Sequence, residues 1–573
     1  MARRARRPSP HFESLAFQVE PRKGVKADTR AARAILRRVF PNRAWIIVPL
    51  NRRTGEFEAT PKAPGKGRLS VGAAWDVSYR LRQAPRIVYA EPLFEVSNSE
   101  QFARPAVRGR RARSAGSGDA DPGTEGNYQW SLDTLRVPQA WALFEARTPG
   151  AGLVVGHPDT GYTTHPEIVG PRLRVADGYD FEDDRADPRD PLAAGVLRHP
   201  SHGTSTSSLI MSAQGLQPGS AGPAFVSGTA PGASLIPIRA TKSVVLWSMR
   251  RLTRAVHHAV DHGAHVISIS LGGPVPSIAL HNAVREAEAQ GVIVLCAAGN
   301  QVRFVVFPAA FDEVIAVAAS RIDDTPWDGS CRGAAVDITA PGSSVWRART
   351  ERANGTDRYK VERGSGTSYA VASTAGIAAL WLSYHGRGAL VARYGRDRLA
   401  AVFKQVRQRT CRTPPGWDGS DFGPGIVNAH ALLRAPLPEE APARGLRGIR
   451  RRPVSADQAP LEHLVHQLGP APRSGVVRAV AELLKVDESE LPDALDDVGA
   501  ELAMAIGTDA ALRQKLREAS TSFARRGPRR AVRSVRAAGG RVALQGGSRR
   551  LRTYLAGASA RSARRPPARA RRK

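Results

Sequence analysis

Four short apolar runs that alternate with helical segments constrain the fold of this chain more than any other feature. Each run is bounded by Gly, Pro or polar residues, and segments 249–261 and 278–290 carry Leu, Val and Ala at helical spacing. Nearly continuous apolar strands separated by helices predict an α/β fold, with a parallel sheet covered by helices on both faces. In such sheets functional side chains gather beyond the carboxyl ends of the strands. The four runs are residues 153–155, 235–238, 266–269 and 292–295.

The N-terminal segment has a different order of elements. Its strand-like and helical patterns follow one another as β-α-β-β-α-β, which predicts a separate α+β domain over residues 1–100. The strand-like runs are 15–19, 44–50, 56–60 and 87–90, and the helical runs are 29–39 and 71–83.

A chain of 573 residues is too long for one hydrophobic core, so we expect several modules. Composition places linkers at 101–127 and 435–457, on either side of the sheet domain at 128–434. A small helical region at 458–522 and a basic disordered tail at 523–573 follow. The Arg-rich cluster at 108–113 suits a maturation cleavage site, although flexible linkers are cut in any case.

The formal net charge of +32 is concentrated in the flanks of the chain. Residues 1–127 carry +13 and residues 519–573 carry +17, whereas 128–434 carries +5 and 435–518 carries −3. A polybasic tail attracts polyanions such as nucleic acid through counterion release. Arg-rich composition without a role explains the same charge, so both interpretations stay open.

The three cysteines, Cys296, Cys331 and Cys411, do not predict a disulfide framework, although one bridge is compatible with their number. The basic N-terminus lacks the apolar stretch of a signal peptide, and no apolar run approaches the length of about 18 residues that a membrane span needs. We expect a protein without a membrane span, either cytoplasmic or exported by an unrecognised route; a misplaced start codon would also explain the missing signal.

Ser368 is the candidate nucleophile. It lies in Gly-Ser-Gly-Thr-Ser-Tyr-Ala, residues 364–370, at the start of a helix rich in Ala and Gly. A helix N-terminus offers unpaired backbone N–H groups and a positive dipole, which stabilise an oxyanion. A lone serine at this place is more often a helix N-cap, so the assignment depends on a base elsewhere in the chain.

Three further polar residues follow predicted strands or open helices upstream. Asp159 lies in Val-Val-Gly-His-Pro-Asp-Thr-Gly, His202 in Ser-His-Gly-Thr-Ser, and Asn300 ends Cys-Ala-Ala-Gly-Asn. An imidazole is the natural general base near neutral pH, a carboxylate orients it, and an amide stabilises an oxyanion. Each residue also fits an ordinary role in a turn or at the surface, and His199 is the nearest alternative base.

With these motifs in the order Asp, His, Ser, the chain resembles the subtilisin-like serine peptidases. The resemblance spans residues 128–434. It implies an endopeptidase that forms an acyl-enzyme on Ser368, with His202 as base, Asp159 orienting it and Asn300 as oxyanion donor. His157 and Pro158 depart from the family, which usually has apolar strand residues before this Asp. No Gly-x-Ser-x-Gly motif surrounds the serine, which disfavours an α/β-hydrolase.

The resemblance also implies that two strand exits bind the substrate backbone as an added strand. The N-terminal domain is similar to a subtilisin propeptide, which assists folding and occupies the cleft until it is cleaved. An ordinary N-terminal domain that stays attached is the alternative. The implied substrate-binding residues are Ser270, Leu271, Gly272, Gly273, Ala297, Ala298 and Gly299.

Six acidic residues between positions 180 and 190 raise the question of a hard cation such as calcium. Their spacing matches no defined calcium loop, so a solvated loop is the better interpretation. We expect no metal ligands and no required cofactor, with calcium unsupported by a defined loop. The six residues are Asp180, Glu182, Asp183, Asp184, Asp187 and Asp190.

A serine endopeptidase acting on protein or peptide substrates is therefore the predicted function, with the N-terminal domain as an intramolecular inhibitor. The alternative, from another class, is a catalytically idle scaffold whose basic tail binds nucleic acid.

Overall fold

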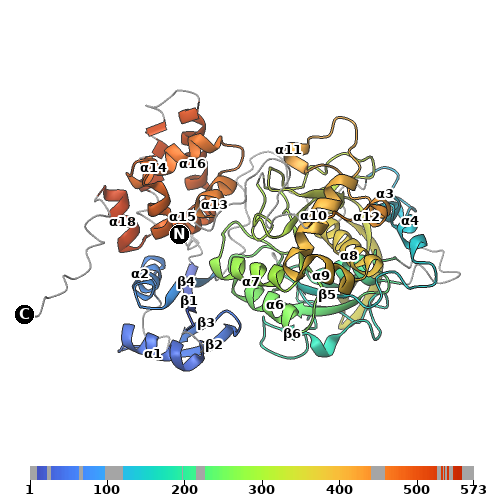
Figure 1. Ribbon diagram of the computed structural model, residues 1–573, viewed down its shortest axis with the longest axis horizontal. Coiled ribbons are helices and arrows are strands. Elements are labelled where there is room, and N and C mark those ends of the chain that lie inside the picture. Colours follow the sequence, from blue (N-terminus) through green and yellow to red (C-terminus); the bar gives the residue numbers. More distant parts are fainter. Residues whose placement is uncertain are drawn as a thin grey trace, which may run out of the picture. The chain divides into compact units, whose positions relative to one another are not determined.

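The computed structural model describes residues 10–21, 27–62, 69–96, 121–195, 198–213, 226–302, 304–440, 459–524, 531–532, 534–535, 538–540 and 546–557 (Figure 1). The chain forms two compact units. The first consists of Met1–Ser97, Pro274–Ala279 and Val454–Lys573, and the second of Asn98–Gly273 and Leu280–Pro453.

A seven-stranded sheet with the order β11-β10-β9-β8-β5-β7-β6 forms the centre of the second unit. All neighbouring strands in it pair in parallel, which confirms the predicted sheet. Three strands, β6, β10 and β11, add to the four that the sequence predicted. The strands are β5 (Val154–Asp159), β6 (Tyr179–Asp180), β7 (Ser234–Arg239), β8 (Val266–Ile269), β9 (Ile293–Ala297), β10 (Ile315–Ser320) and β11 (Ile338–Pro341).

Side chains of the sheet divide between two apolar cores, as helices on both faces require. On β8, Val266 belongs to the core that includes helix α8, whereas Ile267 and Ile269 belong to the core of helices α6 and α7. This alternation follows from the period of two along a strand. The helices of this unit are α3 (Trp130–Thr134), α4 (Val137–Trp141), α5 (His202–Met211), α6 (Arg250–Asp261), α7 (Ile278–Ala289, from Leu280 onward), α8 (Thr367–His385), α9 (Arg387–Tyr394), α10 (Leu399–Thr410), α11 (Gly419–Phe422) and α12 (Ala429–Arg434).

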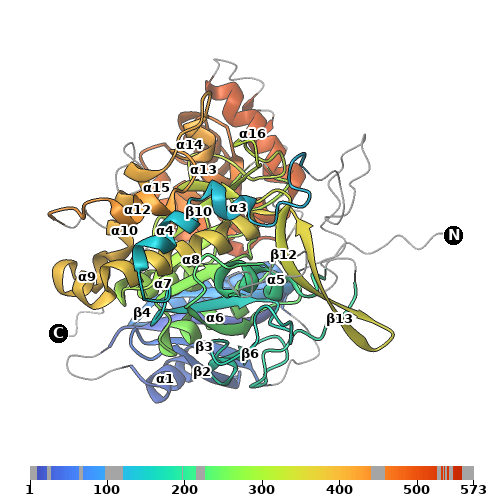
Figure 2. The same ribbon diagram turned by 90° about the vertical axis from the view of Figure 1, so that its right-hand side faces the viewer.

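A long antiparallel hairpin leads into α8 (Figure 2). Its strands, β12 (Val345–Ala353) and β13 (Thr356–Gly364), pair in unbroken register from Val345 opposite Gly364 to Ala353 opposite Thr356. Asn354 and Gly355 form the two-residue turn with φ of 52° and 78°, the left-handed conformations that a type I′ turn requires. The hairpin therefore fixes where the chain enters the helix of Ser368.

The first unit contains a four-stranded antiparallel sheet with the order β2-β3-β1-β4. The predicted β-α-β-β-α-β order is confirmed. Both helices begin at a side-chain cap: Asp28 accepts from the Ala31 N–H at 2.8 Å, and Ser70 accepts from Ala73. The elements are β1 (Pro10–Val19), α1 (Thr29–Val39), β2 (Trp45–Asn51), β3 (Glu56–Pro61), α2 (Val71–Arg82) and β4 (Ile87–Val96).

The C-terminal helices belong to this same unit. They are α13 (Ala459–Leu468), α14 (Arg473–Leu484), α15 (Leu491–Thr508), α16 (Ala510–Ala524) and α18 (Arg549–Ala556). The structure differs from the expected disordered tail at α18, because Leu551 and Tyr554 lie three residues apart and both are buried despite the surrounding arginines.

The predicted linkers are described only in part. Residues 121–127 belong to the second unit, where the Asp121 N–H donates to the Ser344 hydroxyl at 3.0 Å and the Trp346 indole donates to the Thr124 carbonyl at 2.9 Å. The Arg-rich cluster 108–113 and residues 441–457 lie outside the described residues. Cys296, Cys331 and Cys411 are free thiols. Within the described ranges, no helix is both long and apolar enough to cross a bilayer.

Candidate active site

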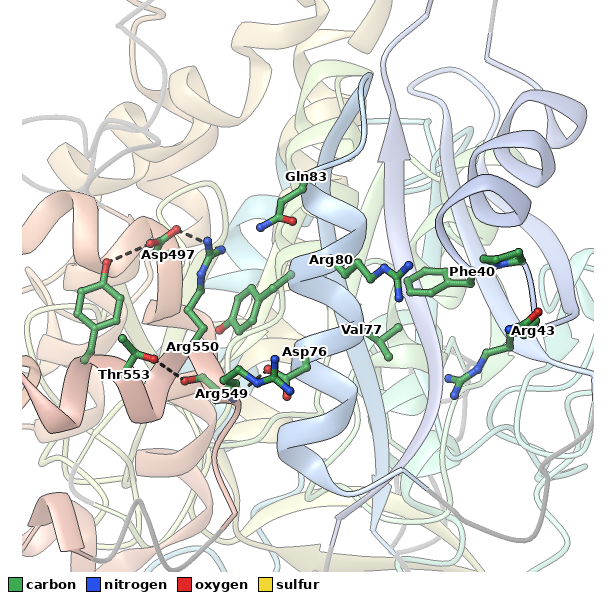
Figure 3. A pocket seen from close by; sticks show the side chains of 14 residues that line it. Phe40, Arg43, Asp76, Val77, Arg80, Gln83, Asp497, Arg549, Arg550 and Thr553 are labelled. Atoms are coloured by element: carbon green, nitrogen blue, oxygen red, sulfur yellow. Dashed lines mark hydrogen bonds and ion pairs between the residues drawn. The ribbon is translucent and has the colours of Figure 1, made fainter. Parts of the chain in front are cut away.

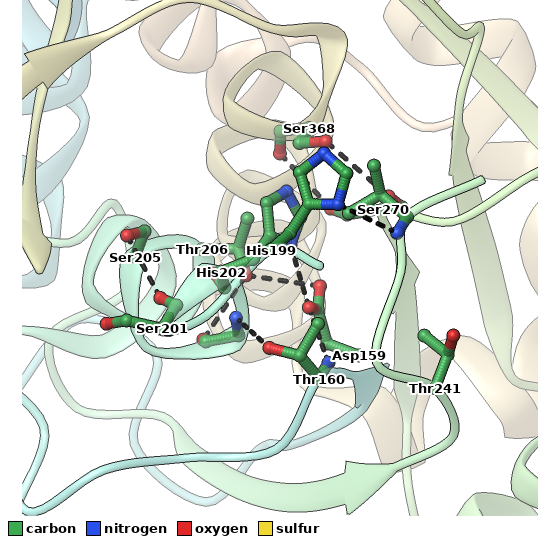
Figure 4. A network of polar contacts seen from close by, with 12 residues as sticks. Asp159, Thr160, His199, Ser201, His202, Ser205, Thr206, Thr241, Ser270 and Ser368 are labelled. Atoms are coloured by element: carbon green, nitrogen blue, oxygen red, sulfur yellow. Dashed lines mark hydrogen bonds and ion pairs between the residues drawn. The ribbon is translucent and has the colours of Figure 1, made fainter. Parts of the chain in front are cut away.

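Asp159 and His202 meet at the carboxyl end of β5, an inner strand of the sheet (Figure 4). Asp159 is the last residue of β5 and His202 the first of α5, and the carboxylate Oδ1 lies 2.7 Å from Nδ1 of the imidazole. The same oxygen accepts the backbone N–H of Thr160 at 2.7 Å. The carboxylate therefore fixes the orientation of the ring and leaves Nε2 to face away from it.

Asp159 is fully buried, and burial alone would raise its pKa. The nearby His202, together with the hydrogen bonds that Asp159 accepts, outweighs burial and holds the pKa of Asp159 below its usual value. The carboxylate of Asp159 is therefore ionised at neutral pH.

Two glycines allow the loops of Asp159 and His202 to approach. A Cβ on Gly203 would lie 2.0 Å from the carbonyl oxygen of Gly161, which has a φ of 98°. The Gly203 N–H donates to the Thr160 hydroxyl at 3.0 Å. A side chain at position 203 would separate His202 from Asp159.

Ser368 lies in the first turn of α8, where backbone N–H groups have no intrahelical partner. Its side chain is buried, and its hydroxyl donates to the Ser270 carbonyl at 3.5 Å, the long limit of a hydrogen bond. The ring centroids of His202 and Tyr369 are 6.4 Å apart, so the imidazole lies beside this turn. In Figure 4 the His202 ring lies between Asp159 and Ser368. Among the described residues, no hydrogen bond joins the Ser368 hydroxyl to His202.

Asn300 lies beside the same helix start. Its Oδ1 accepts the backbone N–H of Thr367 at 3.0 Å and the Thr367 hydroxyl at 2.9 Å, which directs Nδ2 the other way. A Cβ on Gly366 would be 3.6 Å from this Nδ2 and 3.8 Å from the Ser368 backbone N. The Asn300 amide and the Ser368 backbone N–H thus both lie close to the position that a side chain on residue 366 would occupy. Glycine leaves this position empty.

The first predicted substrate-binding segment, Ser270, Leu271, Gly272 and Gly273, follows β8 directly and so reaches the site. Its two glycines are already paired within the chain. The Gly272 N–H donates to Val244 O at 3.1 Å, and Gly272 O accepts from Leu246 N at 2.8 Å. Gly273 exchanges two hydrogen bonds of 2.9 Å with Phe307. A substrate strand can use Gly272 only if the segment 244–246 moves aside.

The second segment, Ala297, Ala298 and Gly299, ends β9 beside the first. Ala298 donates to Val317 O at 2.9 Å and accepts from Val306 N at 3.0 Å. The Gly299 N–H donates to the Thr367 hydroxyl at 3.3 Å, which ties this segment to the start of α8.

Sequence reasoning missed Thr206, which lies one helical turn after His202 on the same face of α5. Its hydroxyl is 3.0 Å from Nε2 of His157 and 3.4 Å from Oδ2 of Asp159. The i, i+4 spacing from His202 was the available signal. His157, noted in the sequence only as a departure, is fully buried, and burial lowers its pKa to about 4.

The acidic loop pairs with basic side chains. Arg239 contacts Asp180 at 2.7 Å and Asp183 at 2.5 Å, and Lys242 contacts Glu182 at 3.0 Å. In the described part of the chain, no group of three or more His, Cys, Asp or Glu side chains is placed to hold a metal ion. The clustered carboxylates are therefore neutralised by the protein's own cations.

Asp190, at the end of that stretch, connects the loops that carry Asp159 and His202. It accepts from the Thr160 hydroxyl at 3.0 Å and from the Ser201 N–H at 2.8 Å, the residues next to Asp159 and His202. Asp190 thus holds both loops from one buried position.

Several known proteins are similar in sequence to this chain. Residues 150–413 match the model of the Subtilase family. Thermitase of Thermoactinomyces vulgaris is 32% identical over 308 residues, which are 53% of this chain and 96% of thermitase. Subtilisin Savinase of Lederbergia lenta is 27% identical over 307 residues, 53% of this chain and 98% of that protein.

Among solved structures, fervidolysin from Fervidobacterium pennivorans, described as a keratinolytic enzyme related to subtilisin, has a TM-score of 0.53 at 20% identity. The match covers 75% of this chain and 62% of fervidolysin, and it concerns the fold alone. The residues that match the Subtilase model include Asp159, His202 and Ser368. The chain belongs to the Subtilase family and is a serine endopeptidase.

Proposed function

We propose that the protein hydrolyses peptide bonds through an acyl-enzyme on Ser368, with His202 as general base and Asp159 as its orienting carboxylate. The observation that carries the proposal is the 2.7 Å contact between Asp159 and His202 beside the first turn of α8. A serine hydroxyl becomes a strong nucleophile only with such a base in reach.

In the proposed reaction, Nε2 of His202 takes the proton of the Ser368 hydroxyl while Oγ attacks the substrate carbonyl carbon. This step requires Oγ to turn from its long contact with Ser270 O. The imidazolium then protonates the leaving amine as the carbon–nitrogen bond breaks. A water molecule, deprotonated by the same imidazole, then attacks the carbonyl carbon of the ester. The bond between that carbon and Ser368 Oγ breaks, the imidazolium returns its proton to Oγ, and the carboxylic acid leaves.

The oxyanion of each tetrahedral intermediate is assigned to the donors that flank Gly366. These are Nδ2 of Asn300 and the backbone N–H of Ser368. Both are held in place before the substrate arrives, so they need no reorganisation as charge develops. The proposed chemistry uses only groups of the chain and assigns no step to calcium or another cofactor.

We assign the substrate backbone to the exits of β8 and β9, where it would pair as an added strand. Before a substrate can pair with Gly272, the hydrogen bonds between Gly272 and the segment 244–246 must break. The N-terminal domain is assigned the role of an intramolecular inhibitor, a proposal supported by its β-α-β-β-α-β order and the resemblance to subtilisin propeptides.

The test is Ser368→Ala, which we expect to abolish both casein hydrolysis and covalent labelling by a fluorophosphonate. Ser383→Ala, on the same helix but distant in sequence from its first turn, is the matched control and should retain both. Full activity of Ser368→Ala would place the nucleophile elsewhere. Absence of both readouts in the unmodified chain would favour the idle scaffold.

A further inference from the structure

The N-terminal domain and the C-terminal helices share a single apolar core. Side chains from the sheet, from α2 and from the C-terminal helices belong to one buried cluster. Separating the two segments would expose this surface to water, which is the main cost of taking apart a folded core. The cluster includes Phe17, Trp75 and Leu81 from the N-terminal domain and Leu464, Val498, Leu502 and Leu551 from the helices.

A buried carboxylate joins the two segments at the edge of that core. Glu501 of α15 is 3% exposed and accepts the hydroxyl of Tyr79 from α2 at 2.9 Å. It also accepts the backbone N–H and the hydroxyl of Ser548, each at 2.6 Å. Loss of Tyr79 as donor would remove one of the two hydroxyls on Oε2 and leave both remaining hydrogen bonds of this buried carboxylate to Ser548 alone.

Backbones of the two segments approach closely at Gly72 of α2. A Cβ on Gly72 would lie 2.1 Å from the carbonyl oxygen of Gly546 and 2.6 Å from that of Gly547. Four residues further along α2, Asp76 accepts the backbone N–H of Arg549 at 2.9 Å, and the two residues lie together in Figure 3. This packing is tight enough to depend on the absence of one methyl group.

We propose that the C-terminal helical region, residues 459–557, is the binding partner that retains the N-terminal domain on the enzyme after the chain is cut between residues 97 and 120. The helices remain joined to the catalytic unit through residues 435–458, so a cut leaves the N-terminal domain bound rather than free. While the N-terminal domain stays bound to the helices, its dissociation from the catalytic unit and its rebinding there are intramolecular events at millimolar effective concentration. Release therefore requires opening of the shared core, whichever protease makes the cut.

The experiment uses the full chain with Ser368→Ala, so that its result does not depend on the proposed catalytic serine. One recognition sequence for a site-specific protease is inserted between residues 98 and 120, a second between 441 and 453, and an affinity tag follows residue 573. After both cuts, the N-terminal fragment should stay on the resin with the tagged helical fragment. Its loss from the tag, or its recovery with the middle fragment alone, would overturn the proposal.

Gly72→Ala tests directly whether the close packing of α2 against Gly546 and Gly547 holds the N-terminal fragment. Alanine favours a helix over glycine, so the change should not harm α2 itself, but its Cβ would collide with Gly546 O. We expect the N-terminal fragment to leave the tagged helices at least about tenfold faster. Gly388→Ala in α9, where a Cβ meets nothing within 4 Å, is the control and should leave the rate unchanged.

Tyr79→Phe serves as a second variant in case Gly72→Ala does not fold. It keeps the ring in the core and removes only the hydroxyl, which is one of three donors to Glu501 and the one that comes from the N-terminal domain; a severalfold faster release is expected. Release at the unmodified rate in both folded variants would show that these contacts do not hold the domain, whatever the state of the middle fragment.

Discussion

Nε2 of His157 lies 3.8 Å from Oδ2 of Asp159 inside the protein, with the Thr206 hydroxyl bridging the two side chains. Because burial lowers the pKa of His157 to about 4, its ring is neutral at neutral pH. His157 supports the Asp159 carboxylate through the Thr206 hydroxyl and not by its own charge.

We expect His157→Leu to leave Thr206 and Ser207 without their imidazole partner and to lower the free energy of unfolding by roughly 1–3 kcal/mol. His157→Gln keeps a donor and an acceptor and should lose less. Urea denaturation at pH 7.5 measures both variants. Equal stability of His157→Leu and the unmodified protein would contradict a structural role for the bridge.

Acid should destabilise the protein partly through His157. Its folded-state pKa lies below the unfolded value of about 6.5, so the unfolded chain binds the proton more readily. The stability that His157 contributes is present above pH 6.5 and is lost as the pH falls towards 4. His157→Gln should therefore show a shallower fall in unfolding free energy between pH 6.5 and 4.5, measured by urea titration at each pH.

Glu167 predicts the opposite pH dependence. Burial raises the pKa of Glu167 to about 7, although it accepts hydrogen bonds from Ser212 and from the Val226 N–H. The folded state holds its proton more tightly than the unfolded state, so its contribution to stability falls as the pH rises from about 4.5 to 7. The difference in unfolding free energy between Glu167→Gln and the unmodified protein should therefore shift in favour of the variant by roughly 1–3 kcal/mol from pH 4.5 to pH 8. Parallel pH profiles of the variant and the unmodified protein would contradict this assignment.

Asn300→Ala is expected to lower kcat by about 10²- to 10³-fold with little change in KM, the magnitude found for the equivalent loss in subtilisin. The amide is needed in the transition state more than in the bound substrate. Thr367→Val removes the hydroxyl that donates to Asn300 Oδ1 but leaves the Asn300 side-chain amide in place. We therefore expect a much smaller loss of kcat. Steady-state kinetics on a chromogenic peptide distinguishes the two, and a purely KM-based loss in Asn300→Ala would argue against an oxyanion role.

Gly203→Ala is expected to lower kcat more than tenfold, because its Cβ would displace α5 from Gly161 O and move His202 from Asp159. Gly419→Ala, where a Cβ meets nothing within 4 Å, is the control. Activity and thermal melting are measured together. An active, equally stable Gly203→Ala would show that the close approach of these loops is dispensable.

The sequence predicted the elements whose pattern is local. The runs at 235–238 and 266–269 became β7 and β8 because they are apolar and bounded by polar or turn residues. The hairpin β12–β13 was missed although Asn354-Gly355 is a strong turn signal. Helix α18 was missed because its arginines hide a narrow apolar face.

The candidate site was predictable where a motif surrounds each residue, as for Asp159 and Ser368. Contacts between distant segments were not predictable in this way. Neither the pairing of Gly272 with residues 244–246 nor the bond between Tyr79 and Glu501 leaves a periodic trace in the sequence. Such contacts depend on tertiary packing, which patterning within one segment does not encode.

The pairing of Gly272 with Val244 and Leu246 affects the substrate specificity that we expect of this peptidase. If a peptide pairs with Gly272 as proposed, it replaces the segment 244–246, so the main-chain hydrogen bonds it gains at Gly272 offset those that are lost. Little net affinity then comes from the backbone at this position, and discrimination falls to the side chains of the newcomer. Extended, unstructured polypeptides could displace the segment 244–246, whereas a tightly folded protein has no free segment that could pair with Gly272.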